Sequence, residues 1–229
     1  MIFFIMDISE RYARLEDRSD IALLKDVSYG NMEAFDELMN RYLDIVSRTS
    51  FRVLCDRNDS ESITTQVFVF LWHNVLDYDD RYSVGEWLLS KTFKYCRLRL
   101  VRRRILSIFG VENDVFVNVS PRAENVDDYI TKQAWELHCR TASHMNSLQS
   151  AVYALCVLEG MSEGKVSLIT GANRLRVESA LHHAEEKVRS GLKSYGKGKD
   201  YDRYNSFLRK IADSLTDMNK LKKMIIFAV

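Results

Sequence analysis

Apolar residues recur along most of the chain at the three- and four-residue intervals of an α-helix. The first such stripe predicts a helix from Asp20 to Val27, which Gly30 then interrupts. Asn31 carries a side chain suited to a helix N-cap, so we expect a second and longer helix to follow it. The apolar face of that helix consists of Phe35, Leu38, Met39, Tyr42, Ile45 and Val46.

Two further helices are predicted in the N-terminal half. Residues 55–60 form a polar turn, in which Asp59 or Ser60 can cap the third helix. A polar loop from Asp77 to Gly85 precedes the fourth helix, which is expected to end near Ile105. The apolar face of the third helix carries Ile63, Val67, Phe68, Leu71 and Trp72.

The helical period fails from Leu106 to about Asp128, in a segment that holds the only proline. We interpret this segment as a flexible linker between two domains. Beyond it the helical pattern returns, and short turns at 159–161 and 171–173 interrupt it. The predicted helices of this second group lie at residues 130–137, 147–158, 162–169 and 174–192.

The pattern therefore predicts an all-α protein with two small helical domains and a C-terminal helical tail. On the tail, one stripe of apolar residues runs from Tyr204 to Ile225. This stripe suits a partner protein, and it suits packing on the chain's own domains equally well. The expected segments are an N-terminal extension at 1–19, domains at 20–105 and 129–195, the linker at 106–128 and a C-terminal extension at 196–229.

Composition supports the helical prediction and indicates in which compartment the protein acts. The 229 residues include one proline and nine glycines, too few for the many turns of an all-β fold. The four cysteines are scattered without metal-ligand spacing, which indicates reduced thiols and a cytoplasmic location. The apolar segments 1–6 and 224–229 are too short to span a bilayer, so we expect no membrane role.

No group of residues in the sequence predicts catalysis. His138, Cys139 and His144 lie near one another along the chain, but their spacing matches no closed zinc site and a fourth ligand is not evident. The sequence also lacks a phosphate-cradling loop and a nucleophile motif. We therefore do not expect an enzyme, a metal site, a cofactor or a small-molecule substrate.

The formal net charge of +1 conceals one strongly basic segment. Between Lys91 and Arg104 the chain has seven basic residues and no acidic one, with aromatic and aliphatic residues interleaved. A row of like charges on a helix repels itself unless anions lie against it, and a nucleic-acid backbone supplies anions at regular spacing. The segment therefore favours contact with DNA or RNA over a merely solvated helix end.

The two helices that flank residues 171–173 fit a helix-turn-helix, although an ordinary helical hairpin fits the same pattern. Arg174 and Arg176 lie in the first turn of the second helix, where basic residues oppose the helix dipole. Their position makes sense if phosphates or guanine edges lie opposite them. The side chains expected to face the major groove are Arg174, Arg176, Glu178, Ser179, His182 and His183.

Three segments, in this order and at this spacing, resemble the extracytoplasmic-function group of sigma factors in the sigma-70 superfamily. The segment GNMEAFDEL at 30–38, followed by Arg41 and Tyr42, is similar to the start of the family's region 2. The segment SESITTQVFVFLW at 60–72 resembles its polymerase-binding helix, and the basic helix follows at the expected distance. Residues 148–192 resemble region 4.

The resemblance implies an alternative sigma factor, which binds core RNA polymerase and promoter DNA and directs promoter recognition, melting and transcription initiation. It implies polymerase contacts by Glu61, Ile63, Gln66, Val67, Phe68, Leu71 and Trp72. It implies contacts to the melted −10 element by Tyr78, Tyr82, Trp87, Lys91, Lys94, Arg97, Arg99 and Arg102. The groove-facing residues of the second domain would read the −35 element, and the linker would thread into the polymerase channels.

The chain departs from the family pattern most in its second domain. Lys165 replaces a capping-box glutamate, and Glu178 places a carboxylate where DNA phosphates are expected. In the first domain, Ser62 and Lys94 replace an acidic residue and an asparagine. We therefore expect weaker recognition of the −35 element and a DNA-bound recruiting protein as a partner, with an anti-sigma factor as a further candidate.

Two other functions remain open from the sequence. A helix-turn-helix regulator could bind duplex DNA without polymerase, which would require a dimer and a palindromic site. A degenerate sigma-like adaptor could have lost the ability to open promoters, in keeping with Ser62, Lys165 and Glu178.

Overall fold

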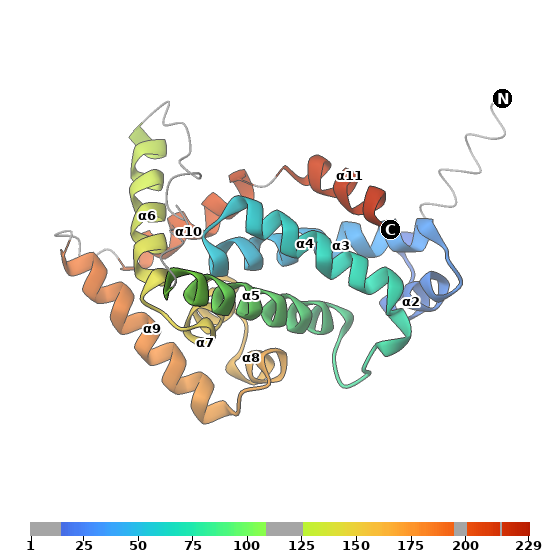
Figure 1. Ribbon diagram of the computed structural model, residues 1–229, viewed down its shortest axis with the longest axis horizontal. Helices are drawn as coiled ribbons and strands as arrows, with labels where there is room; N and C mark the ends of the chain where they lie inside the picture. Colours follow the sequence, from blue (N-terminus) through green and yellow to red (C-terminus); the bar gives the residue numbers. More distant parts are fainter. Residues whose placement is uncertain (1–14, 109–125, 195–200, 216) are drawn as a thin grey trace.

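Helices make up the regular structure of the described residues, as the apolar spacing predicts (Figure 1). The structure is a computed structural model that describes residues 15–108, 126–194, 201–215 and 217–229, with the backbone alone for 126–132 and 211–215. Most of the predicted linker therefore lies outside the described residues. The part of the chain that the structure describes contains no helix long and apolar enough to cross a membrane.

The first domain consists of α2 (Asp20–Ser28), α3 (Met32–Leu54), α4 (Arg57–His73), the short 3-10 helix η1 (Val75–Asp77) and α5 (Val84–Ile108). Helix α3 is central and packs against α2, α4 and α5. The predicted N-cap at Asn31 is confirmed, because its side chain accepts a hydrogen bond from the Ala34 amide at 3.1 Å. The core of this domain includes Phe35, Leu38, Phe68, Leu71, Trp87 and Leu88.

The predicted start of the third helix is wrong by about three residues. Helix α4 begins at Arg57, and Asp56 is its N-cap through a 2.7 Å bond from the Asp59 amide. The Asp59 carboxylate, which we expected as a cap, instead binds two arginines of α5, Arg99 and Arg103. Pairing with charged partners across the fold has overridden the local capping preference of this aspartate.

The second domain consists of α6 (Val126–Ser143), α7 (Ser147–Val152), a helical segment of π type (Tyr153–Leu158), α8 (Glu163–Thr170) and α9 (Arg174–Ser194). The expected helix over 147–158 is helical throughout, but its last turn is wider: the Glu159 amide donates to the Ala154 carbonyl, five residues back. Helices α8 and α9 pack against each other and form the predicted helix-turn-helix.

Gly171 makes the turn between α8 and α9 because its backbone is left-handed, with φ at +66°. Asn173 then caps α9 by accepting a 2.9 Å bond from the Arg176 amide. The apolar sides of the two helices meet through Val166, Ile169 and Val177, all buried. The tight turn and the shared apolar side fix the direction of α9.

The two domains pack directly on each other, an arrangement that the sequence did not reveal. Helix α8 lies against α5, and Leu89 of α5 is buried among residues of the second domain (Figure 1). On another side of the interface, the rings of Phe51 and Trp135 stack in parallel with centroids 4.4 Å apart. The contact is therefore largely apolar, like the inside of one domain.

A buried arginine ties the two domains and the tail together. Arg52 is 2% exposed and pairs with Glu159, at the end of the π-type segment. Its second terminal nitrogen donates to the Arg209 carbonyl in the tail at 3.1 Å, and its own carbonyl lies 3.0 Å from His138 Nε2. Arg48 also pairs with Glu159, at 3.2 Å.

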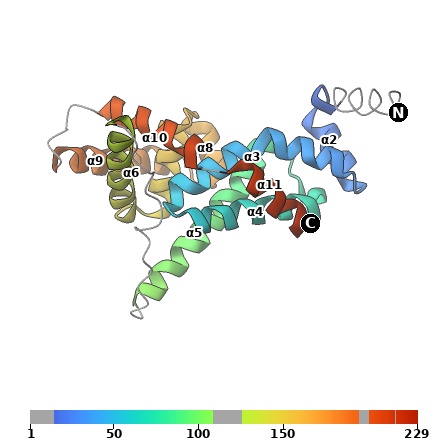
Figure 2. The same cartoon turned by 90° about the horizontal axis from the view of Figure 1, so that it is seen from above.

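The tail folds back on the chain itself, which is the second of the two arrangements that the sequence allowed. Helix α10 (Tyr201–Leu215) packs on α6, with Tyr204 and Leu208 buried. Helix α11 (Met218–Ala228) packs on α4 and α3 (Figure 2). The side chains of Ile211 and Leu215, which belong to the predicted stripe, lie outside the described residues.

The Glu159–Arg52 pair gives a prediction for stability. Replacing Glu159 with alanine leaves the Arg52 guanidinium buried without its carboxylate, and breaking a buried pair in this way costs about 3 kcal/mol or more. We expect the loss to appear as a lower free energy of unfolding in urea, followed by circular dichroism. Asp44→Ala is the matched control, because Asp44 pairs with Arg48 but its side chain is 50% exposed. An equal loss in both variants would contradict this role of Glu159.

Candidate nucleic-acid interface

One face of α5 presents three solvent-exposed cations: Lys94, Arg97 and Arg102, called here the basic ridge. At 100° per residue these side chains lie within one half of the helix circumference. They form no ion pair with the residues that the structure describes. Exposed apolar residues lie between them on the same face, namely Leu98, Val101 and Ile105. An alternation of cations and apolar groups suits a nucleic acid, which offers phosphates and base faces.

Three arginines of α5 form hydrogen bonds or ion pairs within the protein, and of these Arg104 is still exposed. Arg99 donates to Asp59 at 2.7 Å, and Arg103 pairs with Asp59 and donates to the Leu54 carbonyl at 2.9 Å. Arg104 donates to the Met145 carbonyl at 3.1 Å. Of these, Arg99 was predicted to contact DNA; it is half-buried and faces α4 instead. The sequence signal for this was the pair of aspartates at the start of α4.

Lys91, also predicted to contact DNA, lies over two aromatic rings of the first domain. Its ammonium group is 4.6 Å from the centroid of the Phe70 ring and 5.6 Å from that of Trp87, within the range of cation–π attraction. Trp87 itself is 1% exposed, so its side chain lies in the core and not, as the sequence had predicted, where DNA could contact it. Its large apolar surface has been used for packing.

The loop before α5 holds its two tyrosines in fixed positions. The Tyr78 hydroxyl donates to the Tyr82 carbonyl at 2.5 Å, and its ring meets Trp87 edge-on at 5.4 Å. Burial, followed by the nearby Asp80 carboxylate, raises the pKa of Tyr78, so its hydroxyl stays protonated. Both rings are half-buried, at the N-terminal end of the helix that carries the basic ridge.

Gly85 allows α5 to begin against α3. A Cβ atom built at Gly85 would lie 2.8 Å from the ring of Tyr42, closer than side chains tolerate. Tyr42 is held there by a hydrogen bond to Asp20, and burial raises its pKa well above the usual range. The close approach positions the tyrosine loop relative to the central helix of the domain.

Helix α4 presents a different face from the one that the sequence predicted for polymerase. Four of the apolar residues predicted to contact polymerase are at most 2% exposed, because they form the core of the first domain: Ile63, Val67, Phe68 and Leu71. An amphipathic helix of a soluble domain turns its apolar stripe to its own core first. Of the predicted set, Gln66 is exposed, Glu61 and Trp72 are half-buried, and Gln66 donates to Ser62 at 3.2 Å.

The first turns of α9 are exposed on the half of the helix that faces away from the core. Arg174, Arg176, Ser179, His182 and His183 are exposed there, while Val177, Ala180 and Ala184 are buried on the other half. Glu178 accepts a 2.9 Å bond from Arg174, which offsets its charge. The two histidines lie 3.5 and 3.4 Å from Glu186.

Lys165, which replaces the expected capping glutamate, takes part in an interdomain contact. Its ammonium group lies 3.8 Å from Glu86 in the first turn of α5. Ser162 still caps α8, accepting a 3.5 Å bond from the Lys165 amide. The side chain is 63% exposed, so the pair contributes little to stability.

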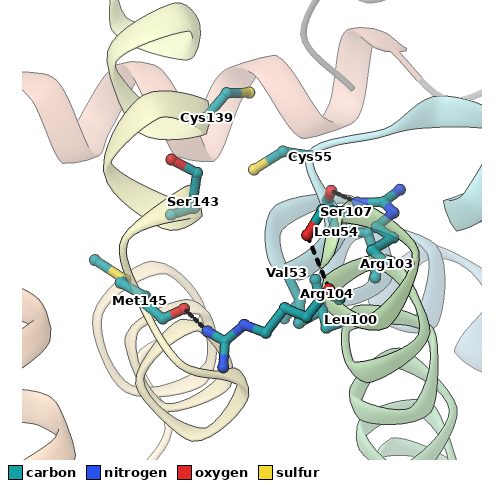
Figure 3. A pocket seen from close by; sticks show the side chains of 11 residues that line it. Val53, Leu54, Cys55, Leu100, Arg103, Arg104, Ser107, Cys139, Ser143 and Met145 are labelled. Carbon is teal, nitrogen blue, oxygen red and sulfur yellow. Dashed lines mark hydrogen bonds between the residues drawn. The ribbon is translucent and has the colours of Figure 1, made fainter. Parts of the chain in front are cut away.

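A small cavity of about 220 Å³ opens between the domains, where the end of α5 faces α6 (Figure 3). Cys55 and Cys139 line it from opposite sides, and Cys55 ends α3 with a left-handed backbone, φ +52°. The hydrogen bond with Cys139 lowers the pKa of the Cys55 thiol, and His138 acts in the same direction. All four cysteines are free, and burial raises the pKa of Cys96 to about 12.

The cavity and the rest of the described residues contain no group of three side chains able to hold a metal ion. The two thiols and His138 are buried at the domain interface. The basic ridge and the start of α9 are, in contrast, exposed to solvent.

Comparison with known proteins finds relatives among RNA polymerase sigma factors. No family model matches the chain. It is 25% identical over 164 residues to the ECF RNA polymerase sigma factor SigE of Mycolicibacterium smegmatis, covering 70% of the chain and 62% of SigE. It is also 25% identical over 180 residues to the RNA polymerase sigma factor CnrH of Cupriavidus metallidurans, covering 74% of the chain and 92% of CnrH.

Solved structures agree with the fold. CnrH in complex with the cytosolic domain of CnrY matches with a TM-score of 0.56 and 17% identity, over 77% of this chain and 99% of that one. The sigma factor RpoE of Bartonella quintana, in complex with the anti-sigma factor NepR, matches with a TM-score of 0.54 and 16% identity, over 69% and 96%. In sequence the chain is thus similar to RNA polymerase sigma factors, one of which is named as an ECF sigma factor, and in fold it is similar to two sigma factors solved in complexes.

Proposed function

We propose that the chain is an alternative sigma factor, which binds core RNA polymerase through its first domain and promoter DNA through both domains. The observation that carries this proposal is the basic ridge. Lys94, Arg97 and Arg102 point outward from the helix that corresponds to the −10-binding part of the family. Such a protein makes no covalent bond, and it acts where polymerase and promoters are, in the cytoplasm.

The proposed role of the first domain is to offset the cost of separating the DNA strands. Unstacking costs on the order of 1–2 kcal/mol per base step. Stacking of an extruded base on an aromatic ring returns about 1–3 kcal/mol, and Tyr78 and Tyr82 offer half-buried rings in the loop that leads into α5. The ridge would hold the phosphates of the same strand, so that a captured base stays in place.

The proposed docking surface for polymerase is narrower than the apolar stripe of α4. Because that stripe forms the core, we restrict the surface to the accessible residues Glu61, Ser62, Gln66 and Trp72. The complexes of CnrH with CnrY and of RpoE with NepR lead us to propose an anti-sigma factor as a partner of this chain too.

The second domain would read the −35 element with the start of α9. Arg176 is the best candidate for base contact, because it is exposed and Arg174 is occupied by Glu178. A single available arginine fits weaker recognition than several would give, so a DNA-bound recruiting protein remains part of the proposal.

The test of this function is promoter opening by purified components. We expect the chain to bind core polymerase and to open a supercoiled template carrying a promoter chosen by mapping its genomic sites, with permanganate reactivity of unpaired thymines as the measurement. Core polymerase alone is the control. Lack of affinity for core polymerase, with a recruiting protein and target DNA supplied, would refute the proposal. Binding without opening would instead favour the sigma-like adaptor.

The basic ridge gives a second prediction. The variant has Lys94, Arg97 and Arg102 replaced by alanine. When the logarithm of its association constant for a −10 single strand is plotted against the logarithm of the salt concentration, we expect a slope that is shallower by about 2. The reason is that each lost phosphate contact removes about 0.7 from the slope. Binding is measured by fluorescence anisotropy of the polymerase complex at several salt concentrations.

A matched triple variant controls for net charge. Lys25, Lys193 and Lys223 are exposed on α2, α9 and α11, and their replacement by alanine removes the same charge away from α5. We expect its slope to stay near that of the unchanged protein. Equal slopes for the two triple variants would exclude the ridge as the phosphate-binding site.

Arg176 gives a third prediction. A contact between its guanidinium and a guanine edge contributes about 1–3 kcal/mol of discrimination, so Arg176→Ala should weaken binding to the −35 duplex about tenfold and relax specificity at one base pair. Arg176→Lys keeps the charge but loses the planar fork, so it should lose the same specificity. Retained specificity in the lysine variant would indicate a phosphate contact instead, and Lys193→Ala serves as an unaffected control.

A further inference from the structure

Helix α11 covers the start of α4, the element to which the proposed function assigns polymerase docking. Lys220 forms an ion pair with Glu61, at 2.6 Å between Nζ and Oε2. Lys222 donates to Asn40 on α3. Glu61 belongs to the proposed docking surface, and with Lys220 beside it its side chain is only 12% exposed.

Apolar packing accompanies these polar contacts. Leu221 and Ile225 are 1% and 0% exposed, and both belong to the core of the first domain. Leu221 lies beside Ser60, Glu61 and Thr64 of α4 and beside Phe51 of α3. The face of α11 with these two residues is thus fitted to the first domain, whereas Ile226 and Phe227 on its other side are 48% and 90% exposed.

The charge of α11 is complementary to the surface that it covers. The helix carries three lysines and no acidic residue, and one of these lysines meets the acidic Glu61. Asp217 caps it by accepting a 3.0 Å bond from the Lys220 amide. A helix of 11 residues is marginal in water by itself, so its helical form depends on remaining docked.

We infer that α11 and core polymerase exclude each other from the same surface of α4. Polymerase can reach Glu61 only after the Lys220–Glu61 pair opens and α11 leaves. The inference rests on the proposed function, because it takes the start of α4 as the docking surface. It makes the chain's own C-terminal helix the competitor that sets how readily the factor joins polymerase.

Competition of this kind has a measurable size. The apparent dissociation constant for polymerase equals the intrinsic constant divided by the fraction of chains with α11 undocked. If about nine tenths of the chains are docked, loss of docking tightens polymerase binding about tenfold. Variants that weaken α11 should therefore bind polymerase better than the unchanged chain, the opposite of what loss of a polymerase contact would do.

The experiment compares four full-length variants for affinity to core polymerase. Lys220→Glu turns the ion pair with Glu61 into a repulsion, and Leu221→Ala removes buried apolar surface. Their controls are Lys223→Glu and Ile226→Ala, which change exposed residues of the same helix. We expect about tenfold tighter binding for the first two and unchanged binding for the controls, with circular dichroism to verify folding.

A second measurement tests the competitor directly. A peptide of residues 217–229, added in excess to the Leu221→Ala chain, should weaken its polymerase binding again, and the same peptide with Lys220→Glu should not. Equal affinities for the unchanged chain and all four variants would overturn the inference while leaving the proposed function intact. Tighter binding by Lys223→Glu as well would also overturn it, because the effect would then be one of net charge. Absence of polymerase binding in every variant would refute the proposed function itself.

Discussion

The arrangement of the molecule depends on the buried pair between Arg52 and Glu159. The guanidinium comes from the central helix of the first domain and the carboxylate from the second domain, and the second terminal nitrogen of Arg52 donates to the tail. A charge this deeply enclosed is tolerated only with its partners in place, so the three parts of the chain hold one another in position. Apolar contacts such as the Phe51–Trp135 stack then close the interface around the pair.

Much of the fold could be predicted from periodicity and end signals, because both are local. The stripes at Phe35–Val46 and the caps at Asn31 and Ser162 placed their helices correctly. The start of α4 was misplaced because Asp59 is used by arginines forty and more residues away, and long-range pairing leaves no trace in local spacing. The packing of the two domains was invisible for the same reason.

The candidate site was predicted with more mixed results. The segment at 91–104 does carry an exposed basic face, but only Lys94, Arg97 and Arg102 are exposed there without a hydrogen bond or ion pair to the described residues; Arg99 and Arg103 bind Asp59, and the exposed Arg104 donates to the Met145 carbonyl. Charge counts alone cannot separate these two groups, since that depends on which face the neighbouring helices cover. On α4 the apolar stripe was assigned outward, whereas a soluble helix uses its apolar residues inward, and only Gln66 and the half-buried Glu61, Ser62 and Trp72 remained for a partner.

The apolar contact between Leu89 and the second domain has a thermal consequence. Moving the domains apart would transfer Leu89, Phe51 and Trp135 into water, and hydration of apolar groups raises the heat capacity. The enthalpy of moving the two domains apart must therefore change with temperature. The free energy that favours the packed domains then passes through a maximum as the temperature is varied. Cooling weakens the apolar part of this contact, so a separated form gains population in the cold as well as in the heat.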